Sequence, residues 1–231
     1  MGTDLTICPL IAKNISLTPL AHQMMMAGDV MTTSLINLEI MKEKLTELKN
    51  IYKEFTQKAS ESKRERACEK GCGFCCKEAG SIDITTLEGL AIREAMKALP
   101  RSRQKSLTKL FQQEIKKREK GIGVPCPFLM KNSACMIYED RPFSCRRIYS
   151  THVCTRENPP VVSRQVMEDA KLTIKALQEL DITGYSGHMS YILYMLSTPE
   201  FLDTYLQGEC KPEEIMVFGK SHKIVINKMV V

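Results

Sequence analysis

Eight cysteines crowded between Cys68 and Cys154 constrain this 231-residue chain more than any other feature. Four of them fall within nine consecutive positions, and four more follow at nearly even intervals. In a reducing compartment clustered thiols usually bind metal or carry out redox chemistry, because disulfides are disfavoured there. The sequence therefore predicts a metal-binding segment held together by its cysteines. The eight candidate ligands are Cys68, Cys72, Cys75, Cys76, Cys126, Cys135, Cys145 and Cys154.

The first cysteine group has the short spacings that let one tight turn direct several thiolates toward a metal. Gly71 and Gly73 lie between the candidate ligands, and residues without a Cβ permit the positive φ angles of such a turn. Cys75 and Cys76 are sequence neighbours that point differently, so they do not suit one mononuclear ion together. Two metal sites, or one cluster with several irons, would use this pair better.

The second cysteine group lies in the segment 121–160, which is rich in Gly, Pro, Cys and Asn and has no apolar periodicity. Folding such a segment costs backbone entropy that burial of its few apolar side chains does not offset. Metal coordination can supply that stabilisation. The alternative, that these thiols are simply small buried residues, explains eight clustered cysteines less well.

The regions on both sides of the cysteines have the apolar periodicity of helices, so we expect a mostly α fold around an irregular metal-binding lobe. One apolar stripe predicts a long helix from about His22 into the charged stretch before Cys68. The broad apolar face favours packing within the chain, although dimerisation through this helix remains the alternative. The stripe consists of Met24, Ala27, Met31, Leu38, Met41, Leu45, Leu48, Tyr52 and Phe55.

Local signals place the remaining elements. Thr85 and Glu88 have the spacing of a capping box that opens a helix, which Pro100 ends. We expect Ser102 to cap a second helix that runs to Gly121. Further helices are predicted at 164–180, 187–196 and 199–206, with one strand near 223–226. The predicted domains are an N-terminal segment with the long helix (1–66), the cysteine-cluster domain (67–160) and a C-terminal helical region (161–231).

The net charge of +6 comes from Lys and Arg that alternate with Glu and Gln at helical spacing. Such runs form solvated helix faces, and without aromatic stacking residues or a reader motif they do not predict nucleic-acid binding. The first twenty residues lack the pattern of a secretory signal, and no transmembrane segment is predicted. We therefore expect a cytoplasmic protein whose partner is another protein.

Three cysteine-rich stretches form a recognisable pattern: Cys68-x3-Cys72-x2-Cys75-Cys76, Cys126-Pro127-Phe128-Leu129 and Cys135-x-Ile137-Tyr138-Glu139-x-Arg141-Pro142-x-x-Cys145-Arg146. Together they resemble the YkgJ-type cysteine-cluster family. This resemblance implies a zinc- or iron-chelating domain over roughly Cys68 to Cys154. One departure is that three residues separate Cys68 from Cys72, where the family often has two.

The predicted cofactor is an iron–sulfur cluster or Zn²⁺. We favour iron–sulfur, because the x3 and x2 spacings plus a more distant cysteine suit a four-iron cluster. The first hypothesis for function is a carrier, sensor or electron-transfer protein. A second is a cluster-dependent protein-modifying enzyme such as a protein lysine methylase, because the family resembles the cysteine-rich part of flagellin lysine N-methylases. A structural zinc domain that serves a partner is the third.

Residues outside the eight cysteines have smaller predicted roles. Arg141 and Arg146 could offset thiolate charge with their guanidinium groups. His152 could replace a thiol, but a surface position is favoured. Cys8 and Cys210 match no motif and are expected to be unliganded. The motif Cys68-x3-Cys72-x-Phe74-Cys75 also fits radical S-adenosylmethionine enzymes, but the alternating strands and helices of their partial barrel do not follow it.

Overall fold

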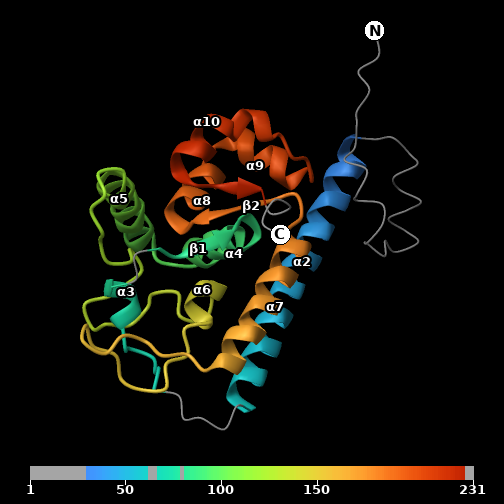
Figure 1. Cartoon of the computed structure of the whole chain (residues 1–231). Helices are drawn as coiled ribbons and strands as arrows, with labels where there is room; N and C mark the ends of the chain where they lie inside the picture. Colours follow the sequence, from blue (N-terminus) through green and yellow to red (C-terminus); the bar gives the residue numbers. More distant parts are fainter. Residues whose placement is uncertain (1–29, 62–66, 79–80, 227–231) are drawn as a thin grey trace.

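The computed structural model describes residues 30–61, 67–78 and 81–226, and these residues form mostly helices with one small sheet (Figure 1). This confirms the predicted mostly α fold. Within the described part of the chain, no helix is long and apolar enough to cross a membrane. The elements in order are α2 (Val30–Glu61), α3 (Phe74–Glu78), β1 (Asp83–Thr85), α4 (Thr86–Lys97), α5 (Arg101–Arg118), α6 (Phe143–Arg146), α7 (Arg164–Leu180), β2 (Tyr185–His188), α8 (Met189–Leu196), α9 (Pro199–Leu206), α10 (Pro212–His222) and β3 (Val225–Ile226).

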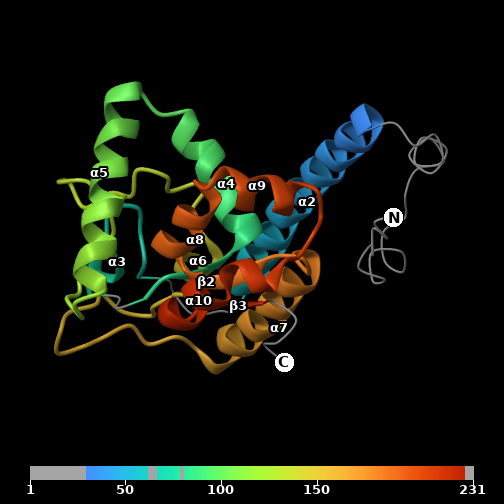
Figure 2. The same ribbon diagram turned by 90° about the horizontal axis from the view of Figure 1, so that it is seen from above.

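The long helix α2 packs against α7 of its own chain, and the two helices lie side by side in both views (Figure 1 and Figure 2). Leu48 and Phe55 of the predicted stripe are almost fully buried, which confirms packing within the chain. Leu38 keeps 51% of its surface exposed, so this part of the stripe is less covered. The predicted helical residues before Val30 and from 62 to 66 lie outside the described residues.

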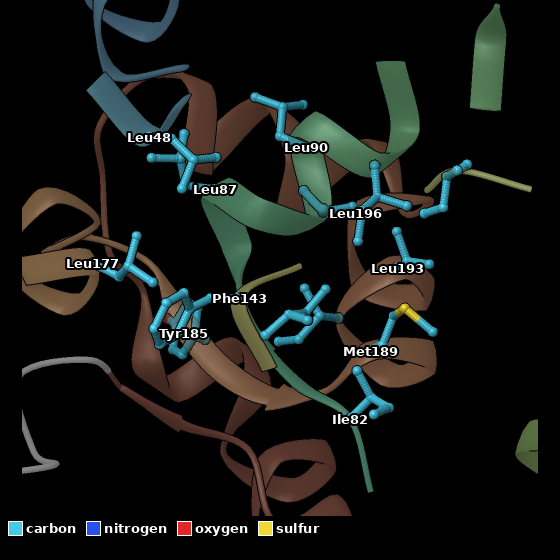
Figure 3. Packing of buried hydrophobic residues seen from close by; sticks show 14 of the residues in the cluster. Leu48, Ile82, Leu87, Leu90, Phe143, Leu177, Tyr185, Met189, Leu193 and Leu196 are labelled. Carbon is cyan, nitrogen blue, oxygen red and sulfur yellow. The ribbon is translucent and has the colours of Figure 1, made fainter. Parts of the chain in front are cut away.

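The core lies where α2, α4, α7 and α8 meet, and Figure 3 shows side chains from these helices packed together. Leu87, Ile192 and Leu196 are each at most 1% exposed. Helices α4 and α8 approach closely because α4 carries Gly89, where an added Cβ would lie 2.8 Å from side-chain atoms of Ile192 and Leu196. A larger residue at this position would therefore force the two helices apart.

The sheet has the strand order β1-β2-β3, and both pairings are antiparallel. Ile84 pairs with Gly187, and Ser186 pairs with Val225. The sheet brings the start of α4 next to the start of α8, because each strand of the first pair leads directly into one of these helices. The strand predicted near 223–226 is confirmed as β3, whereas β1 and β2 were missed.

Two buried carboxylates hold distant segments together. Glu88 completes the predicted capping box, because its Oε2 accepts from the Thr85 amide at 2.8 Å and its amide donates to the Thr85 hydroxyl at 3.2 Å. Its Oε1 accepts from the Tyr52 hydroxyl at 2.6 Å and from the Phe143 amide at 2.7 Å. Glu88 thus ties α2, α4 and α6 to one point.

The second buried carboxylate, Asp181, follows α7 directly. It accepts from the Leu87 amide and from the Tyr205 hydroxyl, each at 2.7 Å. Burial raises the pKa of Asp181 to about 6, while these two hydrogen bonds act in the opposite direction. Asp181 therefore joins α7 to the first turn of α4 and to α9.

The ends of α5 differ in part from the sequence prediction. The predicted cap at Ser102 is wrong, because α5 begins at Arg101 with Pro100 as its N-cap and without a side-chain cap hydrogen bond. The fixed φ of proline suits this entry to the helix. Gly121 has a φ of +72°, as expected for a glycine beyond a helix end.

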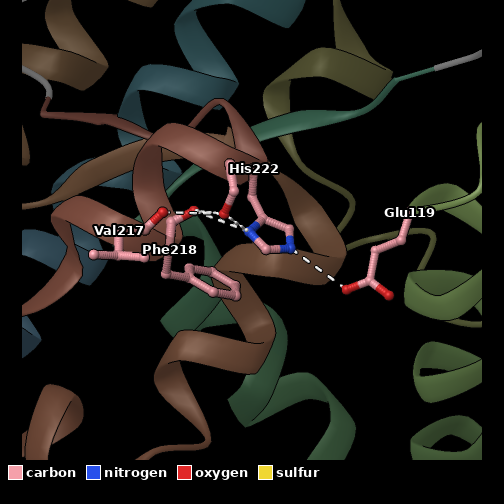
Figure 4. A network of polar contacts seen from close by, with 5 residues as sticks. Glu119, Val217, Phe218 and His222 are labelled. Atoms are coloured by element: carbon pink, nitrogen blue, oxygen red, sulfur yellow. Dashed lines mark hydrogen bonds and ion pairs between the residues drawn. The ribbon is translucent and has the colours of Figure 1, made fainter.

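Helix α10 was not predicted. It reaches α5 through His222, whose Nε2 lies 3.5 Å from Glu119 Oε1 and whose Nδ1 lies 2.9 Å from the Phe218 carbonyl oxygen (Figure 4). Its C-cap, Lys223, has the left-handed φ of 55°. The polar contact of His222 with Glu119 thus joins α10 to the C-terminal end of α5, just before the second cysteine group.

Candidate metal centre

Seven of the eight candidate ligands line one cavity of about 100 Å³. Aliphatic and aromatic side chains such as Ile82, Phe128 and Met189 complete its wall, together with the guanidinium-bearing Arg141. The structure thus brings the two cysteine groups to one place, as expected for a shared metal-binding lobe. The seven lining cysteines are Cys68, Cys72, Cys75, Cys76, Cys126, Cys135 and Cys145.

The turn that carries the first group depends on two glycines. Gly71 has a φ of +97° and Gly73 a φ of +61°, both in the region that favours glycine. An added Cβ at Gly73 would lie 2.8 Å from the Ser133 carbonyl oxygen, so the turn also approaches the second segment too closely for a side chain. The predicted role of these glycines is confirmed. Helix α3 follows the turn and carries Cys75 and Cys76.

Backbone hydrogen bonds place the second group against the first. The Cys126 amide donates to the Cys76 carbonyl oxygen at 2.7 Å, and Leu129 forms an antiparallel bridge with Cys135. Cys145 lies on the short helix α6, whose first amide is held by Glu88. Backbone hydrogen bonds thus hold each of these cysteines at the cavity.

Cys154 lies outside the cavity lining but close to the first group. The Ala67 amide donates to the Ser150 carbonyl oxygen at 3.0 Å, and the Ser150 amide donates to Cys68 Sγ at 3.3 Å. The charge of Cys154 is one of the causes that raise the pKa of Cys75. The loop after Ser150 therefore returns Cys154 to the neighbourhood of Cys68 and Cys75.

Burial favours the protonated form of these thiols. It raises the pKa of Cys75 and of Cys126 to about 12, and it raises the pKa of Cys145 well above the ordinary value. Neighbouring thiolates add to each of these shifts, because like charges oppose further ionisation. A metal ion must therefore displace protons from these thiols when it binds.

Arg141 is the cation that faces the cysteines within the cavity lining. Its guanidinium carbon lies 4.0 Å from the centroid of the Tyr138 ring, a cation–π contact that fixes its position. Among the described residues its buried Nε has no hydrogen-bond partner. This N–H group is thus available to a thiolate sulfur, in line with the predicted role of Arg141. The guanidinium carbon of Arg146 instead lies 4.5 Å from the centroid of the Tyr52 ring.

A buried acid lies behind Cys126. Glu114 is 4% exposed, its Oε1 accepts from Arg118 Nε at 2.7 Å, and its charge contributes to the raised pKa of Cys126. His188 Nε2 lies 3.8 Å from the same oxygen, and burial lowers the pKa of His188 to about 4. This pair could not be predicted from the sequence, because the two residues come from separate elements and match no motif.

The other candidates lie apart from the cavity lining. His152 Nε2 lies 3.0 Å from the Pro159 carbonyl oxygen, so this ring is engaged with the backbone. Cys210 Sγ lies 3.5 Å from the Tyr185 hydroxyl, on the C-terminal side of the molecule. Cys8 lies outside the described residues.

The thiols are gathered around the cavity but are not converged on a single point. Among the residues that the structure describes, no group of three or more His, Cys, Asp or Glu side chains is arranged to hold a metal ion. The chemistry of the donor set nevertheless fits zinc or iron–sulfur, because thiolates are their preferred ligands. Side-chain rotation would have to bring the sulfurs together around the metal. The assignment of all eight cysteines as ligands stays a prediction.

The segment that lines this cavity matches a known protein family. Residues 67–183, just over half of the chain, match the family model CxxCxxCC, which is described as a "Putative zinc- or iron-chelating domain". The chain belongs to this family. The CxxCxxCC region spans all eight candidate ligands and ends beyond α7. Membership supports metal binding by the cysteines, in agreement with the resemblance seen in the sequence. No curated protein and no solved structure matches the chain significantly.

Proposed function

We propose that this chain is a metal-binding protein whose thiolates hold an iron–sulfur cluster or zinc for a redox, carrier or sensor role. The observation that carries this proposal is the cavity lined by seven cysteines from two separate groups. Soft thiolate donors favour these metals over hard cations such as Mg²⁺ and Ca²⁺. The family description names the same two candidates.

Between the two metals we favour iron–sulfur. The x3 and x2 spacings of the first group place three thiols on one turn, and the second group supplies the fourth ligand that a four-iron cluster needs. Cys72 is exposed, which gives a protein partner access for exchange of electrons or metal. Thiols in this number stay reduced in the cytoplasm, which is the compartment we propose.

A cluster-dependent protein-modifying enzyme, such as a protein lysine methylase, is the second candidate. It would need a cosubstrate site beside the metal, and small-molecule sites usually have volumes of about 300–1,000 Å³. The cavity measures about 100 Å³, and the proposed metal would take up part of that space. This small volume favours binding or electron transfer over catalysis on a bound cosubstrate.

Anaerobic purification of the full chain tests this proposal directly. Iron, zinc and acid-labile sulfide would be measured together with the visible absorption spectrum. We expect iron and sulfide in similar amounts, with broad visible absorption that reduction by dithionite bleaches. Zinc without sulfide would select the zinc form of the proposal. A reduced chain that retains neither metal, and takes up neither on reconstitution, would refute metal binding.

A further inference from the structure

The candidate ligands differ in their surroundings. Cys126, Cys135 and Cys145 pack against the hydrophobic core of the molecule, whereas Cys72 is exposed. These three cysteines are half-buried, so a metal bound by them would lie closer to the core than a metal bound by Cys72. Such a difference is unexpected if all of the thiols surround one centre.

The neighbouring cysteines on α3 divide these two environments. Consecutive residues on a helix are rotated by about 100°, so Cys75 and Cys76 direct their thiols to different sides. The Cys76 carbonyl oxygen accepts from the Cys126 amide at 2.7 Å, which places Cys76 against the second segment. We call the thiols on this side the inner set: Cys76, Cys126, Cys135 and Cys145.

The other side of α3 faces the loop that leads to Cys154. Cys68 Sγ accepts from the Ser150 amide at 3.3 Å, and Ser150 itself is fully buried. This contact fixes the first cysteine of the motif beside the last cysteine of the segment. We call the thiols on this side the outer set: Cys68, Cys72, Cys75 and Cys154.

Hydrogen bonds follow the same division. The Cys154 thiol and the Ser150 hydroxyl both donate to the His152 carbonyl oxygen, at 3.6 Å and 2.8 Å. Cys154 therefore lies beside the residue whose amide binds Cys68 Sγ. In the inner set, the Leu129 amide donates to the Cys126 carbonyl oxygen at 3.0 Å, and Leu129 also pairs with Cys135.

Charge balance also distinguishes the two sets. Four thiolates around Zn²⁺ or a four-iron cluster form a dianion, and a buried dianion needs a nearby cation. Arg141 supplies one to the inner set, because it lies between Cys135 and Cys145 in the chain and lines the cavity together with them. The outer set lies closer to water, which can screen its charge directly.

We propose that the chain holds two metal centres, one in the inner set and one in the outer set, each bound by four thiolates. This inference rests on the proposed function and concerns the number of centres and the division of ligands between them. Four thiolates are the complete ligand set of a structural zinc site or of a four-iron cluster. The inner centre is the structural one, and the outer centre is the exchangeable one.

The probe for the test is Co²⁺, followed by cadmium-113, added to the reduced full chain under anaerobic conditions. We expect two Co²⁺ ions per chain with tetrathiolate spectra, and two cadmium resonances. Cys72→Ser should abolish the outer site and leave one ion bound, and Cys145→Ser should abolish only the inner site. Cys210→Ser is the matched control and should still bind two ions. If Cys145→Ser does not fold, Cys135→Ser replaces it.

The outcomes separate this inference from the proposed function. The division into two centres would be overturned if the unmodified chain bound a single ion and each variant lost it. Coupling between two cadmium resonances through a shared sulfur would also overturn it. Either result would leave metal binding intact. Failure of the unmodified chain to bind Co²⁺, iron or zinc would overturn both. Arg141→Gln adds an independent check, because loss of the cation should weaken the inner site about tenfold or more in competition with a chelator. Equal weakening of both sites would contradict its assignment to the inner set.

Discussion

Glu88 has three hydrogen-bond donors from three parts of the chain, and each would be left buried without an acceptor if the carboxylate were removed. Glu88→Ala should therefore lower the free energy of unfolding by about 2–5 kcal/mol, because unsatisfied buried donors cost about 1–3 kcal/mol each and relaxation recovers part of the loss. Urea unfolding at fixed metal content measures this change in the free energy of unfolding. Glu94→Ala on the exposed face of the same helix is the control. If Glu88→Ala destabilised the chain no more than Glu94→Ala does, Glu88 would not hold the three segments together.

Asp181 predicts a pH dependence of stability. Its pKa is raised from 3.8 to about 6 in the folded chain, so the folded state holds its proton more tightly than the unfolded state does. This contribution is fully present below pH 3.8 and is lost as the pH rises through about 6. A shift of this size corresponds to about 3 kcal/mol.

The measurement compares unfolding of the wild type and Asp181→Asn across that range of pH. Relative to Asp181→Asn, the wild type should lose stability as the pH rises from 4 to 7. The comparison cancels the titration of the other carboxylates, which both proteins share. Parallel stability curves for the two proteins would show that the pKa of Asp181 is not raised.

At the scale of elements, the packing of α2 against α7 predicts which substitutions in α2 lower the free energy of unfolding. Leu48 is 1% exposed, so Leu48→Ala should cost about 2–5 kcal/mol of unfolding free energy. Leu38→Ala on the same helix should cost less than about 0.5 kcal/mol, because Leu38 is 51% exposed. Both losses should be independent of protein concentration, and a concentration-dependent midpoint would favour a dimer seam instead.

Sequence patterns predicted the long elements well and the short ones poorly. Helices α7 and α9 begin and end at the residues predicted for them. Strands β1 and β2 have three and four residues, too few for a period of two to stand out. The capping box of Glu88 could be read locally, but its bond to Phe143, 55 positions away, could not. In the same way, adjacency showed that Cys75 and Cys76 diverge, but only the fold shows which segments each of them faces.

At the scale of the whole molecule, metal content should depend on the lobe and on no cysteine outside it. The variant with Cys8→Ser and Cys210→Ser together should keep the wild-type metal content, because Cys210 lies beside Tyr185 and away from the cavity lining. Metal analysis of purified protein measures this, with Cys72→Ser as the comparison that should lose metal. A drop in the double variant would mean that the metal-binding residues extend beyond the lobe.

Removal of metal should loosen the lobe before it affects the core. In the proposed function a metal holds segments 67–78 and 121–160 through their cysteines, whereas α8 is buried among other helices. Chelation should therefore speed hydrogen exchange in both segments and leave α8 protected. Exchange that rises uniformly along the chain would show instead that the lobe and the core unfold as one unit.

The hydrogen bond between the Cys76 carbonyl oxygen and the Cys126 amide brings together two candidate ligands that are far apart in the sequence. A metal bound to both segments is a crosslink that closes a loop of about 50 residues between these positions. By analogy with a disulfide, holding that loop closed in the denatured ensemble would remove chain entropy worth about 4 kcal/mol. Oxidation of Cys76, the one thiol of the inner set that comes from the first segment, would release this crosslink, and the unfolded chain would regain that freedom.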